Sequence, residues 1–515
     1  MPMGIQIANR ACTASFNPGP LVDELHLRWQ PRELVKVSIT HGATVAKCVT
    51  ALAAGALAPG DMVRIGENAV FTVKALRGNE VALGQWDNPD KLHALHGRHA
   101  DAADAAWPEP TAQSVQMWKL ERTPFVPAPC GTNAIASWFG MIATHEFFST
   151  PTGEGNYWEN RMDSFLDLQT LYGTSSEACA KVRSFEGGKL KPDVIADTRF
   201  YRTHAPRALL VLFNREHNLI CDQLVRRYPT QFVTANAEAD DNAIFDAARQ
   251  INIQVFIGCI QAHYVGNVVG KESYADPRFE AAPHPKQDAP MHCSVEFNLL
   301  YRFHQTVPEY WSPVWQYEEL GDGFDLEEEL RLMVSNPCGA FTQHNVPTYL
   351  RDAEIGAYTF SRANGVCSFN DLREHFGMPR YTSFSEFSTD PEVGAILQRY
   401  YATVNDVELY PGVLAEDGRP MGWGVPPTML VCIVTDALSS IIFDRFHCRE
   451  YTREALTQWG YEHAADRNVA MMLADHTGIQ NFADYPYRNL LTLPGFAGYP
   501  YSTVSDSRVQ PHSMV

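Results

Sequence analysis

The chain has 515 residues, which is enough for one large core or a few domains. Its 60 acidic and 41 basic residues give a formal net charge of −19, which argues against nucleic acid as a partner because a phosphate backbone requires basic patches. The 11 cysteines include no Cys-x-x-Cys pair and no dense cluster. This distribution disfavours a zinc site or a disulfide framework and favours reduced thiols in a cytoplasmic protein.

The first part of the chain, residues 1–110, is predicted to be a small β-rich unit followed by a linker. Its start lacks a basic segment followed by an apolar run, so no signal peptide is expected. Strand-like pieces, separated by Gly, Pro and Asn turn residues, lie at 34–40, 61–65, 69–76 and 80–86. Residues 97–110 are rich in His, Ala, Asp and Pro and have the composition of a linker. We therefore place a domain boundary near residue 110.

The remainder, residues 111–515, shows the periodicity of amphipathic helices and few strand signals. Long helical stretches are predicted at 133–148, 207–226, 240–265, 291–304, 391–402 and 427–445. The most apolar stretches, 46–57 and 429–443, are shorter than the ~20 residues of a membrane span. No transmembrane segment is therefore expected, whereas peripheral contact with lipid stays open. The predicted fold class is mainly α with a small β-rich N-terminal unit.

Residues 137–148 form an apolar run that contains a single histidine, His145, near its end. Taken alone, such a histidine is more often hydrogen-bonded within the core than used in chemistry. An imidazole with a pKa near the working pH can also take up a proton and return it, as cleavage of an O–O bond requires. The residues by themselves leave both interpretations open.

Residues 296–309 set a tyrosine and a histidine three positions apart, Tyr301 and His304. At this spacing both side chains are expected to leave one face of a helix, with ~5–6 Å between their Cβ atoms. One face could then offer a metal-binding imidazole and a phenol that the bound group oxidises. For an arbitrary Tyr-x-x-His sequence, an amphipathic helix with both side chains hydrogen-bonded in the core is the alternative.

Longer sequence motifs favour the functional interpretation of His145, Tyr301 and His304 over core hydrogen bonding. Residues 296–304, Glu-Phe-Asn-Leu-Leu-Tyr-Arg-Phe-His, and residues 370–384, Asn-Asp-Leu-Arg-Glu-His-Phe-Gly-Met-Pro-Arg-Tyr-Thr-Ser-Phe, closely resemble the cyclooxygenase and fatty-acid dioxygenase branch of the animal-type haem peroxidases. Together with residues 213–218 and 455–461, they look most like the dioxygenase domain of linoleate diol synthases. The resemblance covers roughly residues 120–500.

The resemblance implies a helical fold enclosing haem b, with His304 as the proximal iron ligand. It also implies that His145 lies uncoordinated on the distal side, where it acts as acid and base. Tyr301 would form the radical that attacks the substrate. The chain departs from cyclooxygenases at Met141, where they have a glutamine, and this difference bears on how efficiently added peroxide is turned over. A distal arginine could correspond to Arg199 or Arg202, or both could be solvated.

Further residues take roles from the same resemblance. Tyr264 falls on the tyrosine that hydrogen-bonds the catalytic tyrosine, and Val265 falls on a residue lining the fatty-acid channel. An ordinary interfacial tyrosine is the alternative for Tyr264. Arg215, Glu216 and His217 form a charged set in mid-helix that the family does not use to bind iron, so we interpret them as scaffold hydrogen bonding.

A calcium site is a further expectation. Family members that hold calcium near the distal histidine use oxygen donors at positions that read Glu146, Asp163, Phe165, Asp167 and Gln169 in this chain. Hard oxygen donors at alternating positions suit Ca²⁺, with Phe165 contributing its backbone carbonyl. Glu in place of Asp and Gln in place of Ser lengthen two of the ligands. A loop closed only by hydrogen bonds is the alternative.

The resemblance implies that the protein is a haem-dependent dioxygenase acting on an unsaturated fatty acid and O₂. The Tyr301 radical would abstract hydrogen from a bis-allylic methylene, and addition of O₂ would give a hydroperoxide. No cysteine lies in a P450-like Phe-x-x-Gly-x-Arg-x-Cys-x-Gly loop, so the hydroperoxide is expected to be released or passed to another protein. The alternatives are a haem peroxidase or oxidase acting on another small molecule, as in biosynthetic tailoring, and a haem-carrying binding or sensing protein.

Overall fold

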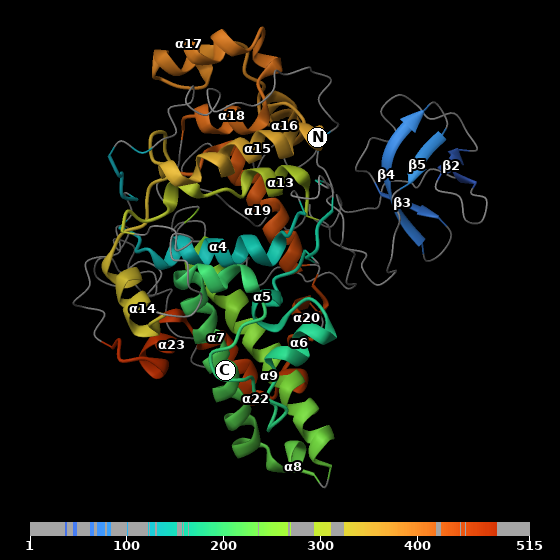
Figure 1. The fold of residues 1–515 in the computed structure, drawn as a ribbon, viewed down its shortest axis with the longest axis vertical. Helices are drawn as coiled ribbons and strands as arrows, with labels where there is room; N and C mark the ends of the chain where they lie inside the picture. Colours follow the sequence, from blue (N-terminus) through green and yellow to red (C-terminus); the bar gives the residue numbers. More distant parts are fainter. Residues whose placement is uncertain are drawn as a thin grey trace.

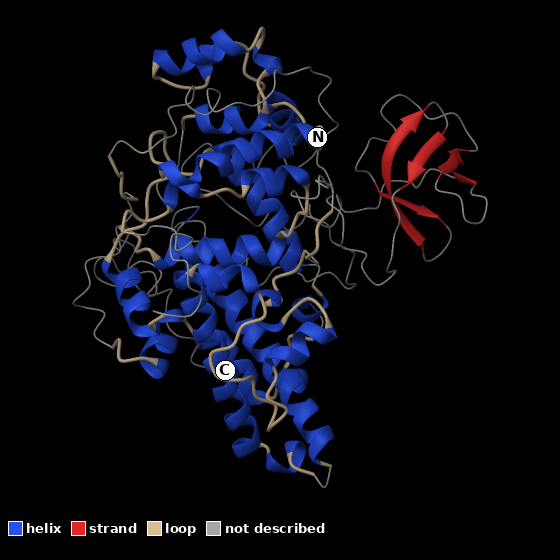
Figure 2. Cartoon of the chain, in the orientation of Figure 1, coloured by secondary structure: helices blue, strands red, loops and turns tan. Residues whose placement is uncertain are grey.

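The computed structural model describes most of the chain after residue 123 and the backbone of five N-terminal strands. The described ranges, in which a few single positions are not described, are 124–128, 131–151, 157–265, 293–310, 324–418 and 424–480, together with residues 100, 122 and 268. Within them helices dominate, and the named strands all belong to the N-terminal sheet (Figure 2). The mainly α fold class is therefore confirmed. Among the described helices, none combines the length and apolar character needed to cross a membrane.

The N-terminal strands form a five-stranded antiparallel sheet in the order β1-β2-β5-β4-β3. The strands are β1 (Val37–Ser38), β2 (Val45–Cys48), β3 (Met62–Ile65), β4 (Ala69–Arg77) and β5 (Glu80–Leu83). Four of them overlap predicted strand segments, whereas β2 was not predicted. The linker at 97–110 lies almost wholly outside the described residues, so the domain boundary and an independent β-rich unit stay predictions.

Five of the six predicted helical stretches are confirmed, and the one at 291–304 is shorter than predicted. The elements from residue 135 to 265 are α4 (Ile135–Phe147), α5 (Gln169–Tyr172), α6 (Ser176–Val182), η2 (Thr198–Arg202), α7 (His204–Arg227), α8 (Pro229–Phe232), α9 (Ala237–Cys259) and η3 (Ile260–Val265). The following elements up to residue 375 are α13 (Val295–Leu300), η4 (His304–Thr306), α14 (Leu326–Ser335), η6 (Thr348–Leu350), α15 (Arg351–Ala363) and α16 (Phe369–His375). The remaining ones are η7 (Phe384–Glu386), α17 (Pro391–Tyr400), η8 (Val404–Asp406), α18 (Leu409–Ala415), α19 (Pro427–Ile442), α20 (Arg445–Cys448), α21 (Arg453–Leu456), α22 (Gln458–Asp466) and α23 (Val469–His476).

The two longest helices, α7 and α9, pack against each other (Figure 1). Helix α9 begins at a good cap, because the Asn236 side chain accepts a hydrogen bond from Ala239 N, and Glu238 adds negative charge to the first turn. Helix α7 ends with Arg226 and Arg227, which suit the negative end of the helix dipole. These two helices form the scaffold below α4 in Figure 1.

Helix α4 is central to the fold and carries the predicted distal histidine. Ten of its 13 residues are buried, so it has no broad polar face and packs on several sides. It contacts α5, α7, α14 and the π-helical turn η3. Figure 1 shows α4 crossing the middle of the molecule, between α7 and α13. Side chains on α4 are therefore placed at the junction of the elements that carry the other predicted site residues.

Candidate functional site

Tyr301 and His304 do not share a helix face, and this part of the prediction is wrong. Helix α13 starts at the Ser294 cap and ends at Leu300, and a separate 3₁₀ turn begins at His304. The two side chains bond to partners on different elements, Tyr264 on η3 and Glu354 on α15, and such tertiary contacts readily outweigh local helix propensity.

The hydrogen bond expected between Tyr301 and Tyr264 is present. The Tyr301 hydroxyl donates to the Tyr264 hydroxyl over 2.8 Å, and both side chains are buried. Tyr264 lies on η3, where α9 continues as a π-helix, a distortion that is frequent at functional sites. Burial raises the pKa of Tyr301, so its phenol stays protonated at any physiological pH.

Aromatic rings enclose Tyr301. Their centroids lie 5.0–6.3 Å from that of the tyrosine and belong to Phe147, Phe148, Phe297 and Phe303. Such an enclosure excludes water and holds the ring by edge contacts. Because Phe147 ends α4, it also brings Tyr301 close to the end of the helix that carries His145.

A glycine on α4 makes room for the tyrosine pair. A Cβ atom placed on Gly140 would lie 2.9 Å from the Tyr264 hydroxyl, and real side chains essentially never come so close. The hydroxyl of Tyr264 is therefore seated against the backbone of α4 while it receives the hydrogen bond from Tyr301. No motif in the sequence marked Gly140.

His304 is oriented by a carboxylate that the sequence did not indicate. Its Nδ1 lies 2.5 Å from Oε1 of Glu354, which is fully buried on α15. Nδ1 therefore acts as the donor, and the lone pair belongs to Nε2, for which no partner is found among the described residues. The His304 side chain is 22% exposed, so it is not closed off on all sides by the protein. Glu354 is 50 residues away in the chain and has no local signal.

Two hydrogen bonds tie the segment around His304 to the distal helix. Ser137 Oγ on α4 and Thr306 Oγ1 on η4 lie 3.1 Å apart. One residue further along α4, Trp138 Nε1 donates to the Tyr310 hydroxyl over 3.2 Å. These contacts fix the first turn of α4 against the chain that follows His304. His145 lies eight residues after Ser137, which corresponds to ~12 Å along the helix axis.

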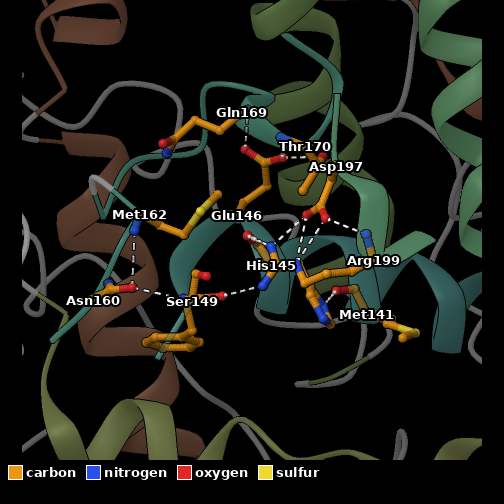
Figure 3. A network of polar contacts seen from close by, with 11 residues as sticks. Met141, His145, Glu146, Ser149, Asn160, Met162, Gln169, Thr170, Asp197 and Arg199 are labelled. Atoms are coloured by element: carbon orange, nitrogen blue, oxygen red, sulfur yellow. Dashed lines mark hydrogen bonds and ion pairs between the residues drawn. The ribbon is translucent and has the colours of Figure 1, made fainter. Parts of the chain in front are cut away.

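His145 has its Nδ1 bonded within its own helix. Nδ1 lies 2.8 Å from the Met141 carbonyl oxygen (Figure 3). The centroid of the imidazole lies 4.8 Å from that of the Phe200 ring. As for His304, no partner for Nε2 is found in the part of the chain that the structure describes. Burial, with a further contribution from the positive charge of Arg199, lowers the pKa of His145 to about 4. The imidazole is therefore neutral near pH 7 and can accept a proton.

Of the two arginines considered for the distal side, the structure places Arg199 beside His145. Its guanidinium donates to the carbonyl oxygens of Phe148, over 3.3 Å, and His145, over 3.4 Å. An ion pair with Asp197, at 2.5 Å, holds it in place (Figure 3). The side chain of Arg202 lies outside the described residues.

The predicted calcium ligands are only partly described. Glu146 is buried, and its carboxylate accepts hydrogen bonds from Gln169 N over 2.8 Å, from Thr170 N over 2.9 Å and from the Thr170 hydroxyl (Figure 3). Asp167 lies close enough to Glu146 to raise its pKa, although burial contributes most. Asp163 is outside the described residues. Among the residues that are described, no group of three or more His, Cys, Asp or Glu side chains is arranged to hold a metal.

The charged set in α7 makes scaffold hydrogen bonds, as expected. Arg215 pairs with Asp193 at 2.7 Å. The buried Glu216 carboxylate accepts hydrogen bonds from side chains of the C-terminal helices, which are His463, Arg467 and His476. Burial alone would raise the pKa of Glu216, but these three partners together hold it well below its usual value.

His217 is fully satisfied on both ring nitrogens. Tyr172 donates to Nδ1 over 2.9 Å, and Nε2 donates to the Gly188 carbonyl over 2.9 Å. The Tyr172 hydroxyl in turn accepts from Asn252 over 2.9 Å. His217 therefore links α7 to neighbouring elements and leaves no nitrogen for a ligand.

The two candidate histidines share one hydrogen-bonding pattern. Each has Nδ1 committed to an oxygen and Nε2 free for a bound group. His304 has a charged partner, which suits a metal ligand, whereas His145 has a neutral partner and a lowered pKa, which suits a proton acceptor. Tyr301 lies three residues before His304 and packs against Phe147, which follows His145 by two residues on α4.

Comparison with known proteins gives independent evidence on the family. The sequence model of the family described as "Animal haem peroxidase" matches residues 193–486, which include Tyr301 and His304. The 7,8-linoleate diol synthase of Pyricularia oryzae is 29% identical over 433 residues, which are 70% of this chain and 37% of that protein. The linoleate 10R-lipoxygenase of Aspergillus fumigatus is 28% identical over 410 residues, which are 66% of this chain and 36% of that protein. The chain thus spans about a third of the length of these relatives.

Solved structures share the fold. The fatty acid alpha-dioxygenase of Arabidopsis thaliana matches with a TM-score of 0.61 at 16% identity, covering 76% of this chain and 79% of that one. Peroxidase A of Dictyostelium discoideum matches with a TM-score of 0.59 at 16% identity, covering 76% of this chain and 95% of that one. The resemblance to linoleate diol synthases and fatty-acid dioxygenases seen in the sequence words is thus confirmed. The family model matches more than half of the chain, and the chain belongs to the animal haem peroxidase family.

Proposed function

We propose that this protein is a haem-dependent dioxygenase that converts an unsaturated fatty acid and O₂ into a hydroperoxide. The observation that carries the proposal is the buried Tyr301–Tyr264 hydrogen bond of 2.8 Å beside the histidine that would bind iron. The relatives named as linoleate diol synthase and linoleate 10R-lipoxygenase support a fatty acid as the substrate.

Haem b would be held by Nε2 of His304 on one side and would have His145 on the other. When bound, it supplies the oxidising equivalent that removes an electron from Tyr301. The neutral His145 accepts a proton from peroxide and returns it to the leaving oxygen. The Arg199 guanidinium lies next to this histidine and favours negative charge that develops there.

Tyr301 then performs the reaction on the substrate. Oxidation passes the electron to the bound haem and the phenolic proton along the hydrogen bond to the Tyr264 hydroxyl, which keeps the Tyr301 oxygen in a fixed position. The tyrosyl radical takes a hydrogen atom from a bis-allylic C–H bond, which re-forms the phenol and leaves a carbon radical. O₂ adds to this carbon, and the resulting peroxyl radical takes a hydrogen atom from Tyr301. The products are the hydroperoxide and the Tyr301 radical, ready for the next substrate.

Several finer assignments remain part of the proposal. Val265 directly follows Tyr264 and would line the fatty-acid channel. Calcium would bind through Glu146, Asp163, Phe165, Asp167 and Gln169, where Glu146 already accepts three hydrogen bonds. A cytoplasmic location and a catalytic domain beginning near residue 111 also stay predictions.

Replacement of Tyr301 by phenylalanine tests the proposal. The variant keeps the ring and its aromatic contacts but has no O–H bond to break. We expect Tyr301→Phe to bind haem and reduce peroxide with an external phenol, while linoleate-dependent O₂ uptake and the tyrosyl radical signal disappear. A matched control is Tyr401→Phe, which removes another buried hydroxyl, one bonded to Glu408 at 3.0 Å, and should keep O₂ uptake. Continued oxygenation by Tyr301→Phe would refute the mechanism.

A second candidate is a haem peroxidase or oxidase acting on another small molecule. The specific observation that favours it is Arg199, because a cation beside the distal histidine assists peroxide cleavage whatever the reductant. Turnover of a phenolic reductant with H₂O₂, compared with O₂ uptake on a panel of lipids, separates the two. Peroxide-dependent turnover without O₂ uptake on any lipid would favour the second candidate.

A further inference from the structure

Glu354 uses both carboxylate oxygens, and each binds a different element. Oε1 lies 2.5 Å from His304 Nδ1, and Oε2 accepts a hydrogen bond from the Tyr410 hydroxyl over 2.7 Å. Glu354 is fully buried and Tyr410 is 1% exposed, so water does not compete for these bonds. The result is a closed chain of hydrogen bonds from α18 through α15 to η4.

The position of Glu354 in the fold makes this chain rigid. Glu354 lies in the first turn of α15, which contacts both α13 and α18. The Tyr410 ring also packs against Tyr358, with the ring centroids 6.1 Å apart. His304, Glu354 and Tyr410 are thus fixed by three separately packed elements rather than by one flexible loop.

The charge of the buried carboxylate is balanced locally. Arg302, two residues before His304, lies near enough to Glu354 and Tyr410 to interact with both electrostatically. Its Nε is buried and finds no hydrogen-bond partner in the described structure, so its contribution to Glu354 is that of a nearby charge. An arginine stays protonated in proteins, and a nearby cation offsets the cost of burying a carboxylate.

We propose that Glu354 and Tyr410 act in opposition on His304: Glu354 orients the imidazole and increases its electron donation at Nε2, while Tyr410 limits that increase. This inference rests on the proposed function, in which Nε2 of His304 binds haem iron. A carboxylate that accepts the Nδ1 proton makes the imidazole a more basic ligand. The Tyr410 hydrogen bond withdraws part of the carboxylate charge and so weakens the effect.

The two partners therefore predict opposite shifts. In Glu354→Gln a neutral amide replaces the carboxylate, so His304 donates less, the ferric state is less stabilised and the Fe(III)/Fe(II) midpoint potential rises. In Tyr410→Phe the carboxylate loses a hydrogen-bond donor and keeps more of its negative charge. His304 then gives more electron density to the iron, and the midpoint potential falls. If Glu354 and Tyr410 had only a structural role, the midpoint potentials of the two variants would not shift in opposite directions.

The experiment uses the full-length protein loaded with haem b and compares the parent with Glu354→Gln, Tyr410→Phe and the control Tyr358→Phe. Tyr358 packs beside Tyr410, but in the described structure its buried hydroxyl has no hydrogen-bond partner. The readouts are the midpoint potential, the iron–histidine stretching frequency of the ferrous form and the affinity for haem titrated into the apoprotein. Circular dichroism establishes that each variant is folded.

We expect Glu354→Gln to change the ferric to ferrous ratio about tenfold, which is ~59 mV for a one-electron couple, and to lower haem affinity roughly 10–100-fold. Its iron–histidine stretch should move down, that of Tyr410→Phe should move up, and Tyr358→Phe should match the parent. If Glu354→Gln does not fold, Tyr410→Phe alone tests the inference. A higher iron–histidine stretching frequency and a lower midpoint potential in this variant would support it.

Shifts of the two variants in the same direction, or no shift in either, would overturn the inference while leaving the proposed function intact. A parent protein that binds no haem would instead overturn the proposed function, and the inference with it. The two failures are therefore distinguishable from the parent spectrum alone.

Discussion

The two candidate histidines use the same ring atom in the same way and differ in the partner that this atom meets. His304 Nδ1 meets a buried carboxylate from α15, and His145 Nδ1 meets a carbonyl of its own helix. A charged partner strengthens a metal ligand, whereas a neutral partner, combined with burial and a nearby arginine, keeps an imidazole uncharged. In the proposed function, the hydrogen bond at Nδ1 distinguishes the histidine that binds iron from the histidine that transfers protons.

The largest expected effect comes from removing the proximal imidazole. His304→Ala should lose haem and its Soret absorption, because neither a carboxylate nor the remaining side chains near Glu354 replace a neutral imidazole as an iron ligand. Spectra of the purified variant measure this. Added free imidazole should restore the Soret band in part, since the cavity is kept. Full haem occupancy of His304→Ala without added imidazole would contradict the assignment of His304 as the iron ligand.

Removing the distal imidazole should leave haem binding intact. His145→Gln should retain the Soret band but react with peroxide roughly 10²–10⁴-fold more slowly, the usual worth of a positioned general acid–base. In the parent, the rate should be constant near neutral pH and fall as the pH drops through about 4, because the protonated ring no longer accepts a proton. Stopped-flow mixing with peroxide measures the rate of the variant and the pH dependence of the parent. A range of roughly pH 3.5 to 8 covers both sides of this pKa. A variant that reacts at the parent rate would remove His145 from the mechanism.

His217 sharpens the comparison because it has no free nitrogen. Burial lowers its pKa to about 4, below the ordinary value of 6.5 that holds in the unfolded chain. Between these values the unfolded state binds the extra proton, so stability falls as the pH drops through this window and is constant above it. His217 should contribute up to about 3 kcal/mol to this loss.

Urea unfolding at several pH values measures the contribution of His217. His217→Gln should be less stable than the parent near pH 7, where it lacks the imidazole hydrogen bonds, but its stability should decline less between pH 6.5 and 4. His145, whose pKa is shifted in the same direction, remains in the variant, so part of the decline persists. An unchanged slope would show that His217 does not titrate in this window.

The smallest expected effect concerns the close contact between the Tyr264 hydroxyl and Gly140 of α4. Gly140→Ala places a methyl group against the Tyr264 hydroxyl, which should shift it away from Tyr301. Overpacking costs about 1–3 kcal/mol, and the better helix propensity of alanine offsets about 1 kcal/mol of it. We expect a roughly tenfold loss of linoleate oxygenation, or ~1.4 kcal/mol, with unchanged peroxide reduction.

The matched control for this variant is Gly356→Ala on α15. A Cβ there meets nothing within 4 Å in the described structure, so this change should stabilise the protein by up to about 1 kcal/mol and leave oxygenation unchanged. Equal oxygenation by parent and Gly140→Ala would show that the close approach to α4 does not position the tyrosine pair.

Much of the fold could be predicted because helix periodicity is local. The stretches that became α4, α7, α9, α17 and α19 were recognised from the spacing of their apolar residues. The 291–304 stretch was predicted too long, since the tertiary contacts of Tyr301 and His304 end the helix at Leu300. Strand β2 was missed because its four residues carry no alternating pattern.

The sequence by itself determined the family, the chemical types of the candidate site residues and the order in which they occur. Long sequence segments shared in the same order identify a family without any knowledge of the structure. The resemblance also indicated that Tyr264 would reach Tyr301 from 37 residues away. Only the tertiary structure showed that Glu354 reaches His304 from 50 residues away and that Tyr410 meets the same carboxylate. Such pairs depend on how separate helices pack, and packing is set by the shapes of many side chains together rather than by any local pattern. The same packing holds the half-buried His145 beside Arg199 and lowers the pKa of its imidazole.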